Sequence, residues 1–346
     1  KMKKRFAPEM MIQCVEAAVN VGDFDAGIKV EQECFGKCLK HPQRESLIYT
    51  FFSEREVAKI PDVPKETPTQ QIEKAAVIGC GTMGGGIAMN FLNVGIPVKS
   101  LEMNQEALDR GFGVIKKNYD IQVQRGRMTA DEVDQRMALL SGTTEYEELK
   151  DADVIIEAIY ENIDVKVEAF QKMEAVAKPG AILASNTSGL DIDKMAAATS
   201  RPEAVIGLHF FSPANVMKLL EVVRGKDTSK ETIASSMKLG KTLNKIAVLS
   251  GNAPGFIGNR MLAGYTRQAG EIILQGATPY QVDNVLLQFG MPMGPFQMND
   301  LVGLDLGWRA RKLGGMKPED VPITARVADK LCELERFGQK TSRGFY

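Results

Sequence analysis

The sequence predicts an α/β protein in which a doubly wound parallel sheet is preceded by a helical segment and followed by an all-α C-terminal domain. Three observations support this prediction. Between residues 74 and 252, short apolar runs alternate with helical stretches, which is the pattern of βαβ units. The first run, "KAAVIG", leads directly into a glycine-rich loop. After "GNAPG" the strand-like runs stop, and only helical periodicity remains.

Changes in composition divide the chain into four segments. Residues 1–60 show only helical periodicity, as in "PEMMIQCVEAAVN". Residues 61–73 contain several prolines and few apolar side chains, which indicates an extended linker. Residues 74–252 form the predicted sheet domain, and residues 253–346 form the predicted helical domain.

The sheet domain can be assigned element by element from its apolar runs, most of which are followed by a helical stretch. The expected helices are "TMGGGIAMNFLNVG", residues 105–123, "VKVEAFQKMEAVA" and "DKMAAAT". The expected strands are "KAAVIG", "PVKSLE", "DVIIEAI", "AILASNT" and "AVIGLHF", with "LLEVVRG" and "IAVLSG" as further strands.

Composition excludes several classes of function. The 346 residues are 44% hydrophobic and 25% charged, which is typical of a globular protein with a real core. The 43 basic and 44 acidic residues leave a net charge of −1, which argues against binding to nucleic acid or to a membrane surface through bulk charge. We find no apolar run long enough to span a bilayer, and "KMKKRFAPEMM" lacks the apolar core of a signal peptide.

Five cysteines, an odd number in a long chain, indicate a reducing compartment. Cys34 and Cys38 would lie one turn apart on a helix, but no second Cys/His pair is near them in sequence. We therefore expect buried thiols and no metal site.

The glycine loop follows the first strand and opens a helix, which is the context that the G-x-G-x-x-G pattern needs. Gly79 permits the tight turn, Gly81 allows close approach of a pyrophosphate, and Gly84 allows close packing of helix and strand. The helix N-terminus adds free N–H groups and partial positive charge. The predicted dinucleotide loop of this Rossmann-type domain comprises Gly79, Cys80, Gly81, Thr82, Met83 and Gly84.

Glu102 ends the second predicted strand, near the distance at which a carboxylate binds the adenosine ribose. Such a carboxylate would repel a 2′-phosphate, and no arginine follows until Arg110. The sequence therefore favours NAD over NADP as the cofactor.

His209 is one of only two histidines and lies at the carboxyl end of the fifth predicted strand, where ligands bind in open α/β sheets. Oxidation of an alcohol by NAD requires a group that takes the hydroxyl proton, and histidine suits that task. A carboxylate on the other ring nitrogen would fix the tautomer. Glu221, the only acid in "MKLLEVV", is the candidate partner, whereas His41 precedes a proline and is expected on the surface.

Two further polar segments are ambiguous on the residues alone. Asn186, Thr187 and Ser188 follow the fourth predicted strand at the ligand edge. Asn259 and Arg260 begin the first helix of the C-terminal domain. Turn or capping chemistry and a role in binding stand as equal alternatives for both segments.

From about Ile72 to Tyr346, the chain resembles the L-3-hydroxyacyl-CoA dehydrogenase family. The motifs that carry the resemblance are "VIGCGTMGGGIA", "EAIYENIDVKVEAF", "ILASNTSGL", "GLHFFSPANVMKLLEVV", "APGFIGNR" and "GPFQMNDLVGLD". Members of this family oxidise the 3-hydroxyl of an (S)-3-hydroxyacyl-CoA with NAD in fatty-acid β-oxidation. The resemblance therefore implies an NAD-dependent oxidoreductase with a coenzyme A thioester as its substrate.

The resemblance also assigns roles to residues of this sequence. His209 matches the general base and Glu221 the carboxylate that orients it, while Ser188 and Asn259 match residues that contact the substrate oxygen. The positions that match cofactor-binding residues, or that line the nicotinamide and substrate side, are Gly79 to Gly84, Glu102, Glu161, Lys166 and Asn186.

Ser212 departs from single-function members of the family, which usually carry asparagine there. "HFFSP" is more similar to bifunctional members, and residues 1–60 resemble the helical end of their enoyl-CoA hydratase domain. We therefore expect a fragment of a multifunctional fatty-acid oxidation enzyme that lacks hydratase activity and whose full-length form has an N-terminal hydratase domain. A homodimer is left open.

Compartment and rival functions follow from the same resemblance. We expect bacterial cytoplasm or, in a eukaryote, the peroxisome or mitochondrion. The rivals are a non-catalytic protein similar to the lens lambda-crystallins and another NAD-dependent β-hydroxyacid dehydrogenase. The latter typically places a catalytic lysine where this chain has "GFIGNRML".

Overall fold

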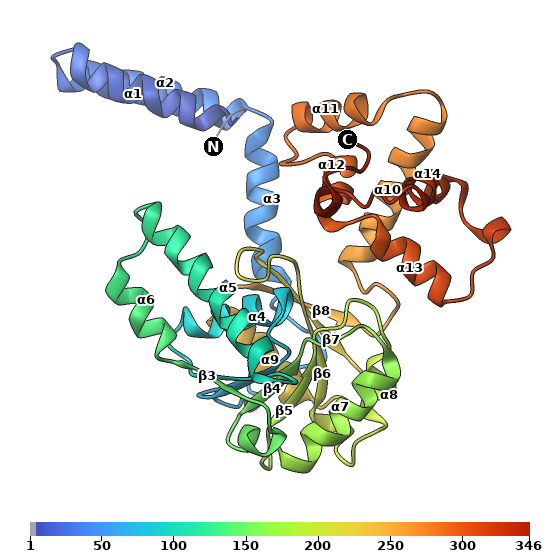
Figure 1. The fold of residues 1–346 in the computed structure, drawn as a ribbon. Coiled ribbons are helices and arrows are strands. Elements are labelled where there is room, and N and C mark those ends of the chain that lie inside the picture. Colours follow the sequence, from blue (N-terminus) through green and yellow to red (C-terminus); the bar gives the residue numbers. More distant parts are fainter. Residues whose placement is uncertain (1–4) are drawn as a thin grey trace. The chain divides into compact units, whose positions relative to one another are not determined.

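The computed structural model describes residues 5–346 (Figure 1). The described residues divide into two compact units, of which one is residues 45–257 and the other comprises residues 5–44 and 258–346. The larger unit contains the sheet and most of the predicted site residues.

The sheet has eight strands in the order β3-β2-β1-β4-β5-β6-β7-β8, so the first six follow the doubly wound arrangement of dinucleotide-binding domains. β1, β4 and β5 are buried along their whole length, as expected for strands covered on both faces. The strands are β1 (Ala75–Ile78), β2 (Val98–Leu101), β3 (Leu140–Thr143), β4 (Val154–Glu157), β5 (Ile182–Ser185), β6 (Val205–Phe210), β7 (Leu219–Arg224) and β8 (Ile246–Gly251).

The predicted fold class is confirmed with one difference, because β6 and β7 pair antiparallel. Residues 211–218 join them without a helix. A parallel crossover needs about a dozen residues or more, so this short connection can only return the chain antiparallel. All other neighbouring strands of the sheet pair parallel.

Helices cover both faces of the sheet, and each face has its own apolar core. α4, α5 and α9 pack on one face through side chains such as Phe91, Ile115 and Ile233. α7 and α8 pack on the other face through Phe170 and Ile192. The helices of this domain are α4 (Thr82–Leu92), α5 (Gln105–Gln124), α6 (Ala130–Met137), α7 (Ile163–Val176), α8 (Ile192–Ala196) and α9 (Lys230–Thr242).

Three elements of this domain are absent from the sequence-based assignment. β3 has only four residues, two of them exposed, so its apolar signal is weak. α6 is short and polar and is fixed by the capping box of Thr129 and Glu132. α9 buries small and polar side chains, including Ser235, Ser236 and Gly240, so its core-facing side gives only a weak apolar pattern in the sequence.

Helices also precede and follow the sheet domain. α1 (Phe6–Asn20) and α2 (Phe24–Lys40) form a hairpin, and α3 (Gln43–Glu56) follows them. His41, expected on the surface, is half-buried and stacks on Phe6 with 4.2 Å between ring centroids. The C-terminal helices are α10 (Gly258–Leu274), α11 (Pro279–Phe289), α12 (Pro295–Val302), α13 (Asp305–Leu313) and α14 (Ile323–Glu333).

Buried aspartates organise the C-terminal helices around a small apolar core. Asp283 accepts hydrogen bonds from the backbone N–H groups of Phe296 (3.0 Å) and Gln297 (2.9 Å), at the start of α12. Asp300 accepts from the backbone N–H groups of Phe345 (2.8 Å) and Tyr346 (3.1 Å). These charged acceptors give partners to backbone donors in and beside this core.

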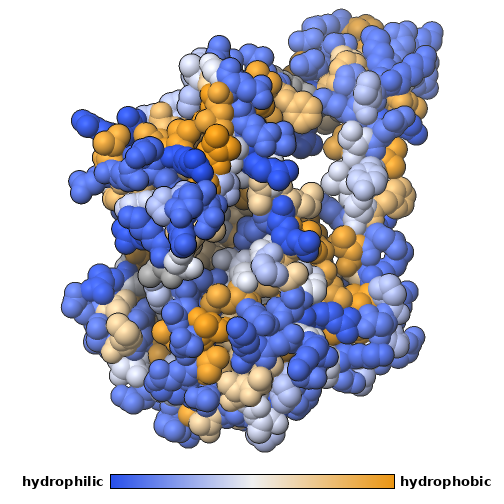
Figure 2. All heavy atoms as spheres, turned by 90° about the vertical axis from the view of Figure 1, so that its right-hand side faces the viewer, coloured by the Kyte–Doolittle hydropathy of each residue, from blue (hydrophilic) through white to orange (hydrophobic). Residues whose placement is uncertain are grey.

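The surface is largely hydrophilic, and orange apolar patches interrupt it on the face shown in Figure 2. Exposed large side chains include Met11, Val19 and Phe24 in the α1–α2 hairpin. Among residues 5–346, no helix has the length and apolar character needed to cross a membrane.

Asp153 anchors the start of the sheet and provides a first test of the fold. Its carboxylate accepts from the backbone N–H groups of Glu73 (2.7 Å) and Lys74 (2.9 Å) and lies 2.7 Å from Lys178 Nζ. Burial raises the pKa of Asp153, but the bonds from Lys178 and the backbone outweigh it and lower the pKa overall. Asp153→Asn is therefore expected to reduce the free energy of unfolding by about 1–3 kcal/mol in denaturant titrations near neutral pH.

A lowered folded-state pKa stabilises the fold above the unfolded value of about 3.9 and loses this effect as the pH falls. The difference between wild type and Asp153→Asn should therefore shrink in acid. Asp151→Asn, a change at a neighbouring exposed position, is the matched control and should unfold like wild type. Equal unfolding free energies for all three proteins at neutral pH would contradict the prediction.

Candidate active site

The predicted site residues of the larger unit gather at the carboxyl ends of its parallel strands. The strand order reverses between β1 and β4, and ligands of open α/β sheets bind outside the strand ends at such a switch point. The loop after β1, Glu157 at the end of β4, Asn186 after β5 and His209 near the end of β6 all lie at this edge.

The glycine loop has the geometry that the sequence predicts. Gly79 has φ +90°, a conformation that favours glycine. A Cβ on Gly84 would lie 1.8 Å from the carbonyl oxygen of Gly79, so only glycine fits there. A Cβ on Gly81 would meet nothing within 4 Å, so the backbone of Gly81 faces open space. No side chain caps the N-terminus of α4.

Glu102 supports the glycine loop directly. Its Oε1 accepts from the backbone N–H of Cys80 at 2.7 Å, and its Oε2 accepts from that of Met103 at 3.1 Å. Burial, together with the Glu102 charge, raises the pKa of the Cys80 thiol to about 11, so this thiol remains protonated. The carboxylate therefore lies beside the loop, at the end of β2, as the sequence indicates.

A cavity of about 650 Å³ opens beside this loop. Its wall contains Cys80, Gly81 and Thr82 of the loop, Glu102 of the neighbouring strand end, and residues of α5 and of the β6–β7 connection. Arg110 and Asn118 of α5 and Arg125, which follows its last residue, supply polar groups to the wall. The cavity has a volume within the range of small-molecule sites.

His209 and Glu221 face each other across the antiparallel β6–β7 pair, where they are direct register partners. His209 Nδ1 lies 2.7 Å from Glu221 Oε2, so the two predicted partners are joined. Both side chains are buried, with 5% of His209 and 1% of Glu221 exposed. A neutral imidazole in this pair donates its Nδ1–H to the carboxylate, which leaves Nε2 as the acceptor.

Neighbouring groups fix both members of this pair. The His209 ring lies 4.4 Å from the ring of Phe211 and 5.7 Å from that of Phe256, measured between centroids. Glu221 Oε1 accepts from the backbone N–H of Ile257 at 3.0 Å. Both carboxylate oxygens therefore have partners, as a buried charge requires.

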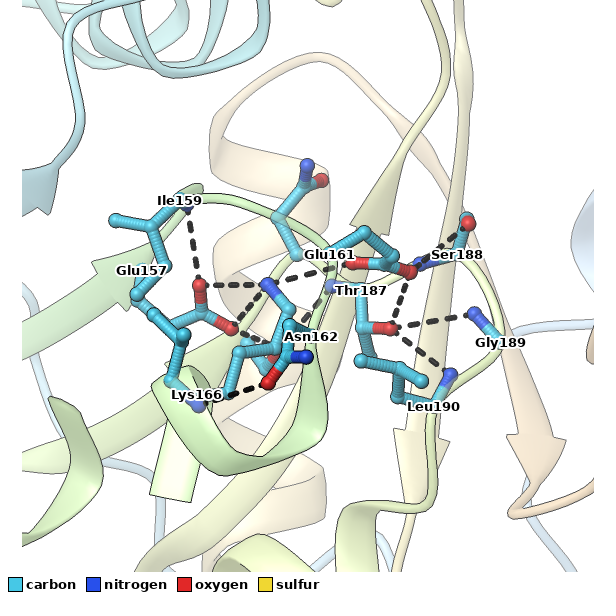
Figure 3. Close-up of polar contacts among 12 residues, drawn as sticks. Glu157, Ile159, Glu161, Asn162, Lys166, Thr187, Ser188, Gly189 and Leu190 are labelled. Carbon is cyan, nitrogen blue, oxygen red and sulfur yellow. Dashed lines mark hydrogen bonds and ion pairs between the residues drawn. The ribbon is translucent and has the colours of Figure 1, made fainter. Parts of the chain in front are cut away.

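Thr187 and Ser188, which follow β5, belong to a second hydrogen-bond network, drawn in Figure 3, whereas Asn186 bonds to β6. Asn186 Oδ1 accepts from the backbone N–H of Phe210 at 2.9 Å and so ties the end of β5 to β6. Ser188 donates its backbone N–H (2.9 Å) and its hydroxyl (3.0 Å) to Glu161 Oε1. The Thr187 hydroxyl donates to the same oxygen at 2.7 Å.

Lys166 connects this network to Glu157, a residue that the sequence analysis does not single out. Lys166 Nζ lies 2.9 Å and 2.8 Å from the two carboxylate oxygens of Glu157 and 3.4 Å from Glu161 Oε2. The available signal was an acid within an apolar strand run, "DVIIEAI", the same signal that identified Glu221. Ser185, which donates its hydroxyl to Glu157, carries no comparable signal.

Asn259 and Arg260 begin α10 in the other unit, as the sequence predicts. Within the larger unit, His209 is paired with Glu221, and Ser188 with Glu161. In the part of the chain that the structure describes, no cluster of three or more His, Cys, Asp or Glu side chains could hold a metal ion. None of the five cysteines is in a disulfide.

Comparison with known protein families identifies both domains. The family model of the 3-hydroxyacyl-CoA dehydrogenase NAD-binding domain matches residues 74–253. The model of the 3-hydroxyacyl-CoA dehydrogenase C-terminal domain matches residues 255–346. Together they extend over well more than half of the chain.

Individual relatives agree with the family models. The peroxisomal bifunctional enzyme of Danio rerio is 41% identical over 100% of this chain and 49% of its own length. The human peroxisomal bifunctional enzyme is 40% identical over 98% of this chain and 49% of its own length. The chain therefore spans about half the length of these relatives.

Solved structures show the same fold. The (S)-3-hydroxybutyryl-CoA dehydrogenase of Ralstonia eutropha is 33% identical, with a TM-score of 0.73 over 80% of this chain and 99% of that chain. The dehydrogenase part of multifunctional enzyme 1 from C. elegans is 28% identical, with a TM-score of 0.62 over 85% of this chain and 69% of that chain.

Proposed function

Because the chain belongs to the 3-hydroxyacyl-CoA dehydrogenase family, we propose that it oxidises (S)-3-hydroxyacyl-CoA to 3-oxoacyl-CoA with NAD, using His209 as the general base. The observation that supports this proposal most strongly is the 2.7 Å contact between His209 Nδ1 and Glu221 Oε2 at the ligand edge of the sheet. It supplies an oriented proton acceptor at the same edge of the sheet as the dinucleotide loop.

Each group has a defined task in this reaction. Bound NAD supplies the acceptor for the hydride that leaves the substrate carbon. His209 Nε2 takes the hydroxyl proton, while Glu221 keeps the Nδ1–H tautomer and stabilises the imidazolium that forms. Electrons and protons balance, because the carbon loses a hydride, the oxygen loses a proton, and a ketone remains.

Ser188 is the proposed contact to the substrate oxygen, which becomes a carbonyl in the reaction, and the role of Asn259 stays a prediction. Hydrogen bonds that strengthen in the transition state lower the barrier, whereas those equally strong in the ground state do not. The substrate hydroxyl has one proton, which His209 takes, so Ser188 must donate to the substrate oxygen; without substrate, its hydroxyl donates to Glu161 Oε1.

The glycine loop fits the cofactor's pyrophosphate, because the face of Gly81 is open and α4 presents an uncapped N-terminus. Gly81→Ala should therefore fold normally but place a methyl group where the phosphates approach. We expect at least a tenfold loss of NAD affinity, about 1.4 kcal/mol, in calorimetric titrations.

Gly113→Ala is the matched control, since a Cβ there also meets nothing within 4 Å but the position lies on the exposed side of α5. This control should keep wild-type NAD affinity. Wild-type affinity in Gly81→Ala as well would show that the dinucleotide does not cross the loop at this position.

The direct test of the proposed function is turnover of (S)-3-hydroxybutyryl-CoA and a long-chain (S)-3-hydroxyacyl-CoA with NAD. NADH formation is expected, and the two substrates establish the acyl preference. A chain that binds NAD without turning over either substrate would favour the lambda-crystallin-like alternative. The peroxisomal names of the two bifunctional relatives favour a peroxisomal role in β-oxidation among the expected compartments.

A further inference from the structure

Glu157 and Lys166 form an ion pair that the proposed chemistry does not use. Glu157 is 0% and Lys166 1% exposed. Both carboxylate oxygens of Glu157 contact Lys166 Nζ, and they also accept from the Ser185 hydroxyl and from the backbone N–H of Ile159 at 3.2 Å. A buried ion pair is weak evidence that the two residues stabilise the fold, because apolar residues of similar volume often give a fold of equal stability. A positional role is therefore the better explanation.

Lys166 lies between the carboxylates of Glu157 and Glu161 (Figure 3), and each carboxylate supports one part of the turn after β5. Glu157 accepts from the Ser185 hydroxyl, whose oxygen accepts from the backbone N–H of Thr187 at 3.1 Å. Glu161 accepts from the Thr187 hydroxyl, whose oxygen accepts from the backbone N–H of Leu190 at 2.9 Å. Two chains of hydrogen bonds, one from Glu157 and one from Glu161, therefore hold residues 185–190. Both carboxylates contact the same cation, Lys166 Nζ.

Glu161 is the most exposed of the three charged residues in this arrangement. Its side chain is 42% exposed, whereas that of Lys166 is 1% exposed, so the buried ammonium provides the fixed point. Lys166 approaches Glu161 Oε2, while the turn uses Oε1. Attraction to the buried cation limits rotation of the Glu161 carboxylate, and its orientation determines where the Ser188 hydroxyl proton points.

We propose that the Glu157–Lys166 pair positions the Thr187–Leu190 turn by fixing Glu161, and thereby sets the hydrogen-bond direction of Ser188. In this role Glu157 and Lys166 are positioning residues. The effect on catalysis rests on the proposed function, in which Ser188 contacts the substrate oxygen, whereas the effect on the turn does not.

The experiment compares Lys166→Met with the charge-neutral double variant Glu157→Gln/Lys166→Met. Removal of Lys166 alone leaves the Glu157 carboxylate buried without its cation, and burial already raises the pKa of Glu157. The double variant avoids this imbalance and should unfold close to wild type. Lys172→Met is the control, because Lys172 lies on the same helix and forms an exposed pair with Glu168.

Hydrogen exchange measures the turn without reference to activity. In the double variant, amide exchange across residues 187–190 is expected to rise about tenfold, while exchange in β6 (Val205–Phe210) stays at the wild-type rate. Lys172→Met should match wild type in both segments. Wild-type exchange of residues 187–190 in the double variant would overturn the proposal, whether or not the chain has dehydrogenase activity.

Turnover then tests the consequence for catalysis. We expect kcat to fall about tenfold in Lys166→Met. If Lys166 acts through Glu161, Glu161→Gln and Glu161→Gln/Lys166→Met should have the same kcat. If the double variant instead shows the product of the kcat losses of Lys166→Met and Glu161→Gln, Lys166 does not act through Glu161, and this part of the proposal is wrong. An inactive wild type would contradict the proposed function instead, and the exchange experiment would still decide the inference.

Discussion

His209→Gln is expected to lower kcat for oxidation of (S)-3-hydroxybutyryl-CoA by about 10²–10⁴-fold, the range over which a positioned general base contributes. The substituted amide can still accept a hydrogen bond but cannot take up the hydroxyl proton near neutral pH. Because His209 packs between Phe211 and Phe256, glutamine also preserves more of the local packing than alanine would. Initial rates of NADH formation at saturating NAD measure the effect.

His41→Gln is the natural control, because it removes the only other histidine of the sequence. That variant should keep wild-type kcat. NAD affinity should be the same in both variants and in wild type, since the prediction concerns the proton and not the cofactor. Retention of most activity in His209→Gln would refute its assignment as the base.

Glu221→Gln is expected to lower kcat by a comparable factor, about 10²–10⁴, although Glu221 does not itself contact the reacting atoms. Glutamine can accept from the backbone N–H of Ile257 as Glu221 Oε1 does, so the local fold is largely retained. It supplies no negative charge for the imidazolium, and its amide NH₂ can face Nδ1 and impose the wrong tautomer.

The measurement for Glu221 combines kcat with thermal unfolding. A loss of kcat with little change in unfolding temperature indicates an orienting role, whereas parallel losses indicate a structural one. Glu231→Gln, which removes an exposed carboxylate from α9, should change neither quantity. Wild-type kcat in Glu221→Gln would show that the charge next to His209 is dispensable.

The His209–Glu221 pair was predictable because its signal is local. Each residue is the polar exception in an apolar strand run, and the short connection of residues 211–218 makes the two strands neighbours. The glycine loop was predictable for a similar reason, since its spacing and its place between strand and helix are both visible in the sequence.

The Glu157–Lys166 pair shows where sequence reasoning ends. Glu157 has the same signal as Glu221, but its partner, Lys166, was named only through the family resemblance, which did not link it to Glu157. A lysine on a helix is most often exposed, so the burial of Lys166 follows only from the three-dimensional position of the carboxylates around it. The chains of hydrogen bonds through Ser185 and Thr187 likewise depend on turn geometry.

The weakest elements of the prediction are those with little apolar patterning. β3 is a four-residue edge strand with the sequence "LSGT", and its place in the sheet is set by pairing with β2. α9 buries serine, threonine and glycine, which periodicity analysis counts as polar or neutral. The positions of β3 and α9 are therefore determined by contacts with the rest of the domain and not by an apolar pattern of their own.

The most direct test of the account is a comparison of NADH production by wild type and His209→Gln, with (S)-3-hydroxybutyryl-CoA as the substrate. We predict one NADH per substrate oxidised by wild type, and turnover reduced by at least a hundredfold in the variant, the lower bound for loss of a general base. Equal rates of NADH formation by the two proteins, both with NAD bound, would contradict the account.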